Sequence, residues 1–134
     1  MSAPEYLLDS SVCVAILRNQ AGLHRLPAPE RAGIPIIVAA ELWTGVEKNR
    51  ATHPHHESRL GAFLGLFPLL DFDLEAARHY ADIRARLEAK GVLIGPLDLL
   101  IAAQARSLDA TLITGNGNEF KRVPGLKVQS WKPA

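Results

Sequence analysis

Short apolar runs alternate with amphipathic segments along this chain, and this alternation constrains its fold more than any other feature. The runs are rich in Leu, Ile and Val, as expected for strands that are buried on both faces of a sheet. We expect these strands at residues 5–9, 34–38, 68–72, 111–114 and 127–131. Apolar spacing between them predicts helices at residues 10–18, 39–48, 54–66, 74–90 and 96–107, and a loop-rich crossover at 19–33.

Strands that alternate with helices predict an α/β fold, because each helix carries the chain back to the start of a parallel neighbour. We expect a three-layer α/β/α fold with a central, mainly parallel sheet of about four to five strands. The 134 residues fit one domain, so we expect a single domain over 1–134. Asp73 and Gly91 are placed to cap the two ends of the helix at 74–90, and Pro96 suits the first turn of the next helix.

The charge balance argues against a protein whose whole surface attracts nucleic acid. Lys and Arg number 15 against 14 Asp and Glu, so the formal net charge is +1. An anionic partner would therefore be held by a local basic patch or through a bound metal ion. The single cysteine, Cys13, excludes an internal disulfide and a cysteine-based zinc site, and its apolar setting predicts a buried thiol.

The first residues lack the basic and apolar regions of a signal peptide, and no apolar run reaches the roughly 18 residues of a membrane span. We therefore expect a cytoplasmic protein with no membrane partner.

Three carboxylates follow strands or open helices. Asp9 ends the first strand, Glu41 falls in the first turn of the expected helix at 39–48, and Asp98 falls in the first turn of the helix at 96–107. Each has a simple alternative explanation, since acidic residues stabilise helix N-termini by about 0.3–1 kcal/mol. Together, however, they would share the crevice at the carboxyl edge of the sheet, where like charges need a cation or shared protons.

The ligand chemistry of these carboxylates favours Mg²⁺, with Mn²⁺ as an alternative, because both ions prefer oxygen ligands and no Cys or nearby His is present. Such an ion can bind a phosphodiester, generate hydroxide and stabilise the leaving oxygen. It would also allow a nearly neutral protein to act on an RNA backbone.

Four segments in order carry a family resemblance: Leu7–Ser11 at the start, Ala40–Gly45, Ile94–Ala103, and the stretch Thr111–Leu126 with its Thr-Gly-Asn and Val-Pro-Gly-Leu pieces. With them the chain resembles the PIN-domain ribonucleases of the VapC toxin family over nearly its whole length. The resemblance implies a Mg²⁺-dependent endoribonuclease toxin of a type II toxin–antitoxin module that cuts tRNA or other structured RNA. It also implies a homodimer and inhibition by a VapB-type antitoxin, with DNA contacted only through that antitoxin.

The resemblance implies a catalytic set of Asp9, Glu41, Asp98 and Asn116, of which the three carboxylates bind the metal. Two departures affect this set. Ser10 and Ser11 follow Asp9 where the family usually has Thr-Asn, and we expect the Ser10 hydroxyl to donate a hydrogen bond near the metal. Asn116 stands where relatives often have a fourth Asp, and Glu119 is the alternative residue to complete the acidic site.

Other polar residues give weaker indications. Arg18, Lys48 and Arg50 are candidates for RNA contacts near the crevice. His53, His55 and His56 resemble a metal cluster, but a solvated helix start explains them as well.

Two other functions remain open at this stage. A phosphoacceptor signalling domain shares the fold plan, but it needs an acidic pair after the first strand, where Ser10 and Ser11 stand, and a helix after the last strand. A catalytically impaired PIN-fold module that binds RNA or protein is the second alternative.

Overall fold

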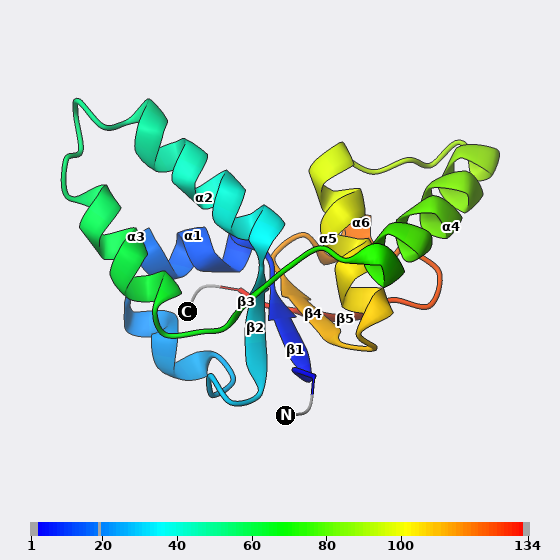
Figure 1. Ribbon diagram of the computed structural model, residues 1–134, viewed down its shortest axis with the longest axis horizontal. Helices are drawn as coiled ribbons and strands as arrows, with labels where there is room; N and C mark the ends of the chain where they lie inside the picture. The colour runs from blue at the N-terminus through cyan, green and yellow to red at the C-terminus, as the bar shows by residue number, and fades with distance from the viewer. Residues whose placement is uncertain (1–2, 19, 133–134) are drawn as a thin grey trace.

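The computed structural model describes residues 3–18 and 20–132, and its helices and strands alternate as expected (Figure 1). The elements are β1 (Tyr6–Leu8), α1 (Ser10–Arg18), the 3₁₀ helix η1 (Gln20–Arg25), β2 (Ala32–Pro35), α2 (Ile36–Lys48), α3 (His56–Leu64), β3 (Leu69–Leu70), α4 (Leu74–Lys90), α5 (Pro96–Ser107), β4 (Thr111–Thr114), α6 (Gly117–Phe120) and β5 (Lys127–Ser130).

The sheet has five strands in the order β3-β2-β1-β4-β5, and every pair in it is parallel. The central strand is β1, with Tyr6 opposite Ala32 of β2 on one side and Thr111 of β4 on the other. This confirms the expected parallel sheet. Because the strands are parallel, their carboxyl ends meet at one edge, from which α1, α2 and α6 continue.

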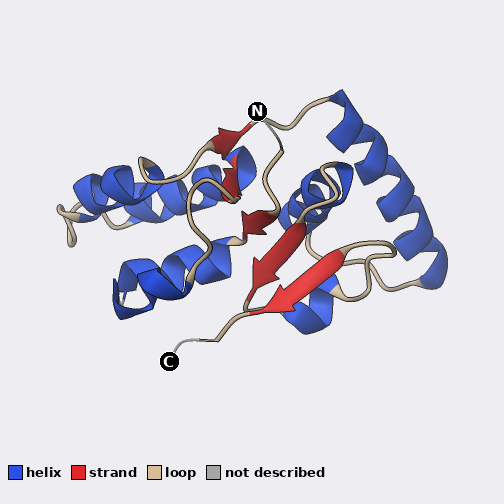
Figure 2. Ribbon diagram, turned by 90° about the horizontal axis from the view of Figure 1, so that it is seen from below, coloured by secondary structure: helices blue, strands red, loops and turns tan. Residues whose placement is uncertain are grey.

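Helices cover both faces of the sheet, which confirms the three-layer arrangement. One face carries α1, α2, α3 and η1, and the other carries α4 and α5 (Figures 1 and 2). Among the residues that the structure describes, no helix is both long enough and apolar enough to cross a membrane.

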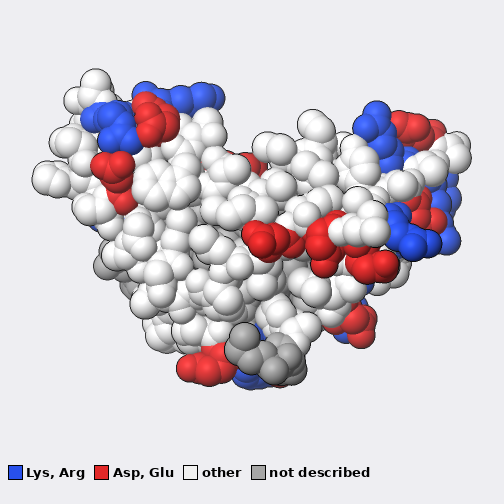
Figure 3. Space-filling view, viewed as in Figure 1, with Lys and Arg blue, Asp and Glu red and all other residues white. Residues whose placement is uncertain are grey.

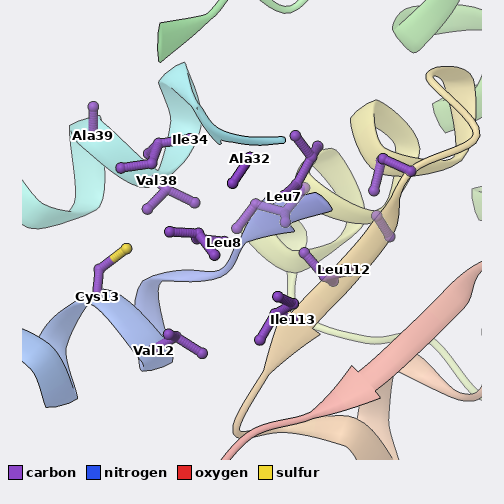
Figure 4. Close-up of a cluster of buried hydrophobic side chains, with 14 of the residues drawn as sticks. Leu7, Leu8, Val12, Cys13, Ala32, Ile34, Val38, Ala39, Leu112 and Ile113 are labelled. Carbon is purple, nitrogen blue, oxygen red and sulfur yellow. The ribbon is translucent and has the colours of Figure 1, made fainter. Parts of the chain in front are cut away.

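The core forms where the central strands meet the helices, as Figure 4 shows. Leu7 and Leu8 of β1 are fully buried, so one side chain serves each face of the sheet. Leu112 of β4 and Val12 of α1 are equally inaccessible. Cys13 is buried in the same cluster, and this burial raises the pKa of its thiol, with a further contribution from the charge of nearby Asp9. The expected buried thiol is confirmed.

The predicted caps of α4 are confirmed. The Asp73 side chain accepts a hydrogen bond of 2.9 Å from the Ala76 backbone N–H, which satisfies a free donor of the first turn. Gly91 ends the helix in the left-handed conformation, with φ of 67°, which costs a glycine little. Pro96 occupies the first turn of α5, as its fixed φ favours.

One predicted strand was misplaced. The strand expected at 34–38 lies at Ala32–Pro35, and α2 begins at Ile36. The apolar, β-branched run after Pro35 resembles a strand, but in the structure it is the first turn of a helix, in which Val38 is buried and Ile36 is exposed. Glu41 is therefore in the second turn of α2, and the prediction that it lies in the first turn is wrong.

Candidate functional site

Asp9 follows the central strand and is 1% exposed. Its Oδ2 atom accepts hydrogen bonds from the Ser11 hydroxyl at 2.8 Å and from the Thr114 hydroxyl at 2.7 Å. In the described part of the chain, the partners of this carboxylate are thus hydroxyls rather than the free N–H groups of α1. The structure therefore does not support the simple explanation of Asp9 as a helix cap.

The two hydroxyls are themselves held by the backbone after β4. The N–H of Gly115 donates to Ser11 Oγ at 2.9 Å, and the N–H of Asn116 donates to Thr114 Oγ1 at 2.9 Å. Each hydroxyl thus accepts a hydrogen bond from the backbone and donates one to Asp9. This network fixes the orientation of the carboxylate by joining the ends of β1 and β4.

Two carboxylate oxygens at this edge are buried without a partner. They are Oδ1 of Asp9 and Oε1 of Glu41, neither of which has a hydrogen-bond partner among the residues that the structure describes. Partial burial raises the pKa of Glu41, the charge of Asp9 raises it further, and the nearby Ser10 hydroxyl offsets part of the effect. Buried carboxylate oxygens without donors are costly unless a cation satisfies them.

Asp98 faces the same group of charges from the first turn of α5. Burial, followed by the charges of Asp9, Glu119 and Glu41, raises its pKa to about 7. Glu119 lies beside it, and its Oε1 accepts a hydrogen bond of 3.1 Å from the Gly95 backbone N–H. The structure thus brings the three predicted carboxylates and Glu119 into one electrostatically coupled group.

These carboxylates share a crevice without closing around one point. Figure 3 shows a hollow between the α2 side and the α4–α5 side of the molecule, with acidic atoms at its floor. On this face, Lys and Arg lie toward the outer ends of the two sides. Within residues 3–18 and 20–132, however, no three acidic, His or Cys side chains are close enough to form a ready metal-binding group.

A groove of about 410 Å³ leads away from Glu41 between α1, α2 and α3. Its walls are mainly apolar, and Arg18, Arg59 and His56 add polar groups. The Arg59 guanidinium donates to the carbonyl oxygen of Leu17 near the end of α1. Arg18 is thus the RNA-contact candidate that lies on a path to the carboxylates.

The other predicted contact residues are less favourably placed. Arg50 is bound to Glu47 and Glu57 in exposed ion pairs, so its charge is already matched. Lys48 is exposed at the end of α2. The rings of His53 and His56 stack with centroids 4.6 Å apart.

Asn116 is exposed at the N-cap of α6, and its side chain does not cap that helix. Its backbone N–H serves the Asp9 network through Thr114, as described above.

The sequence did not identify Ser11 and Thr114 as the donors to Asp9. Ser11, not Ser10, donates to Asp9, while Ser10 lies near Glu41. Which of two neighbouring serines faces the carboxylate depends on how α1 is rotated, which their order does not reveal. Thr114 could have been suspected, because a polar residue that ends an apolar strand lies at the carboxyl edge of the sheet.

Comparison with known proteins agrees with this architecture. Residues 6–126 match the PIN domain. The chain belongs to the PIN-domain family. This PIN-domain protein is 37% identical over 131 residues to "Ribonuclease VapC2" of Rickettsia felis, which covers 94% of this chain and 97% of that protein. It is 32% identical over 130 residues to "tRNA(fMet)-specific endonuclease VapC" of Salmonella typhimurium, and the match covers 95% of this chain and 98% of that protein. The resemblance to VapC proteins is confirmed.

Solved structures give the same result. The VapBC2 complex of Rickettsia felis bound to a promoter DNA fragment contains a chain that matches with a TM-score of 0.81 and 35% identity, over 95% of this chain and 98% of that one. The DNA-bound VapBC complex of Salmonella typhimurium matches with a TM-score of 0.87 and 30% identity, over 96% and 99%.

Proposed function

We propose that this protein is a metal-dependent endoribonuclease, the toxin of a type II toxin–antitoxin module. The observation that carries the proposal is the pair of buried, unpartnered oxygens, Asp9 Oδ1 and Glu41 Oε1, in a crevice that also receives Asp98. A purely structural role would leave these oxygens without any compensation. Membership of a family whose relatives are named ribonucleases supports the same conclusion.

The residues fit Mg²⁺, or Mn²⁺, because every candidate ligand is a carboxylate oxygen. Asp9, Glu41 and Asp98 would hold the ion, and side-chain rotation would be needed for all three to reach it. When bound, the ion neutralises this crowded charge, positions the scissile phosphate and activates water.

The protein's own groups then have distinct tasks. Ser11 and Thr114 hold Oδ2 of Asp9 and leave its buried Oδ1 available to a cation. Without a cation, burial and the charges of Asp9, Glu119 and Glu41 raise the pKa of Asp98 to about 7, so a proton can relieve part of the crowded negative charge that a bound ion would otherwise neutralise.

We propose RNA as the substrate, and tRNA or another structured RNA as its class. The Salmonella typhimurium relative is named a tRNA(fMet)-specific endonuclease, and it matches this chain over 95% of its length. The arginines of the groove, Arg18 and Arg59, would contact phosphates near the carboxylates. A nearly neutral net charge requires such local contacts.

We also propose a VapB-type antitoxin as partner and a homodimer as the assembly. Three similar chains of known structure belong to VapBC complexes from Rickettsia felis, Salmonella typhimurium and Haemophilus influenzae, and the first two of these complexes are bound to DNA. DNA would then be contacted through the antitoxin rather than by this chain.

The decisive experiment is cleavage of purified tRNA by the isolated protein, with EDTA and with Mg²⁺ or Mn²⁺ restored. We expect cleavage that EDTA abolishes and that either cation restores. Cleavage that is insensitive to EDTA would contradict metal dependence. If no RNA is cut under any of these conditions, the impaired PIN-fold binding module is the better description.

A further inference from the structure

We propose that Glu119 is a positioning residue that holds the N-terminus of α5, and thereby Asp98, against the crevice, acting as a hydrogen-bond acceptor rather than as a fourth metal ligand. This inference rests on the proposed function, since it assigns a role within the same site. The carrying contact is the 3.1 Å hydrogen bond from the Gly95 backbone N–H to Glu119 Oε1.

The N-terminus of α5 needs such an outside acceptor. Gly95 is its N-cap and has no side chain to cap the helix, and Pro96 follows it. The first bond of the helix runs from the Leu99 N–H to the Gly95 carbonyl at 2.9 Å, so Gly95 determines where the first turn begins. Asp98 stands within that turn, so the position of Gly95 determines where the Asp98 backbone lies.

Glu119 is itself held on a firmly anchored element. Its neighbour Phe120 is fully buried, and it is one of the largest side chains in the core. Gly117 packs so closely on β5 that an added Cβ would lie 2.9 Å from Ser130 Oγ. The α6 turn therefore gives Glu119 a fixed base from which to hold α5.

A second contact joins the same two segments. The Arg122 guanidinium, just beyond α6, donates to the Leu93 carbonyl at 3.4 Å. Residues 119 and 122 thus hold the backbone on both sides of Ile94, which is itself buried. We call these two contacts, Glu119 with the Gly95 N–H and Arg122 with the Leu93 carbonyl, the clamp on the loop between α4 and α5.

Asp98 and Glu119 also converge on one place. A Cβ built on Gly95 would lie 3.6 Å from Asp98 Oδ2 and 3.9 Å from Glu119 Oε1. Because the Gly95 N–H already occupies Oε1, this oxygen serves the backbone. Glu119 also makes a side-chain hydrogen bond with Asp98, so the two carboxylates meet beside the Gly95 amide. A glutamine at position 119 would keep a carbonyl acceptor for the Gly95 N–H.

The test compares Glu119→Gln, which keeps an acceptor and removes the charge, with Glu119→Ala, which removes both. Asn118→Ala, on the exposed side of the same short helix, is the matched control. The first readout is hydrogen exchange of the Gly95 amide without metal or RNA, and the second is the Mn²⁺ dissociation constant measured by calorimetry. The third is the rate of RNA cleavage.

We expect Glu119→Gln and the control to keep Gly95 protection, with Mn²⁺ affinity and cleavage within about threefold of the wild type. Glu119→Ala should lose the protection and weaken metal affinity and cleavage by about 10- to 100-fold. If Glu119→Gln weakens Mn²⁺ binding as much as Glu119→Ala does, the charge matters and Glu119 is a ligand. If Glu119→Ala keeps Gly95 protected, the clamp is wrong. Gly95 exchange tests the clamp even if the wild type cuts no RNA, so the two proposals can fail separately.

Discussion

The two sides of the crevice hold their carboxylates in opposite ways. Asp9 is 1% exposed at the end of the central strand, and two hydroxyls fix one of its oxygens. Asp98 is half-buried in the first turn of a helix, beside the Glu119 contact, and its pKa is raised to about 7. Asp9 is thus oriented by a hydrogen-bond network at the ends of β1 and β4. Asp98 instead follows a loop whose Gly95 amide is bound by Glu119 of α6.

This contrast separates orientation from charge. On the Asp9 side, the orientation is set before any ion arrives, because the two hydroxyls that donate to Asp9 are themselves held by the backbone N–H groups of Gly115 and Asn116. On the Asp98 side, the number of negative charges depends on pH and on the presence of a cation. Four predictions test this difference.

The largest effect is expected from Asp9→Asn. The amide keeps a carbonyl acceptor for Ser11 and Thr114, so the protein should fold, but the anionic ligand is lost. We expect RNA cleavage to fall by at least about 10³-fold. Asp71→Asn, an exposed carboxylate just after β3, is the control and should retain full activity. Equal activity of the two variants would remove Asp9 from the site.

Thr114→Val tests whether orientation matters apart from charge. The substitution removes the donor to Asp9 Oδ2 and the acceptor for the Asn116 N–H, both at a fully buried position. We expect the free energy of unfolding to fall by about 1–3 kcal/mol. Cleavage should fall by about 10- to 100-fold. Urea denaturation and tRNA cleavage measure the two effects. Thr114→Ser keeps the hydroxyl and should recover most of the activity; if it does not, packing rather than hydrogen bonding is the cause.

Asp98 makes stability depend on pH. Its pKa is about 7 in the folded state against 3.8 for the ordinary group, so the folded state binds this proton more tightly than the unfolded state. The resulting stability is present at low pH and is lost as pH rises through about 7. Without divalent cations, Asp98→Asn should therefore raise the melting temperature at about pH 8 by roughly 2–5 °C more than at about pH 5. Equal changes in melting temperature at the two pH values would show that the neighbouring charges do not raise the pKa of Asp98.

The smallest effects should come from the arginines outside these two regions. Arg18 lines the groove that reaches Glu41, so Arg18→Ala should raise the KM for tRNA by about tenfold with little change in kcat. Arg50 is exposed and already paired with Glu47 and Glu57, and Arg50→Ala should change the KM by less than about twofold. Steady-state kinetics measures the KM of both variants. A larger increase in KM for Arg50→Ala than for Arg18→Ala would indicate that the RNA binds near the C-terminal end of α2 instead of in the groove.

Local signals in the sequence predicted most of the fold. Asp73, Gly91 and Pro96 act on their own turns, so the ends of α4 and the start of α5 were placed correctly. The run after Pro35 was assigned wrongly because its β-branched residues favour a strand, whereas packing in the structure makes them helical.

The candidate site was only partly accessible to the same reasoning. Its carboxylates were identified because they follow strands or open helices, and the structure brings them to one edge. The groups that orient them were not, because Thr114 meets Asp9 across 105 positions and Glu119 meets Gly95 across 24. Such contacts arise only when the chain folds, and they leave no periodic pattern in a single sequence.

The pairing of β1 with β4 also has a consequence for the timing of synthesis. During synthesis Asp9 is made 105 residues before Thr114, whose hydroxyl orients it together with groups held by the Gly115 and Asn116 amides. Until they leave the ribosome, β1 lacks its β4 neighbour and Asp9 has no fixed orientation. A nascent chain therefore cannot orient Asp9 until β4 has been made and has paired with β1.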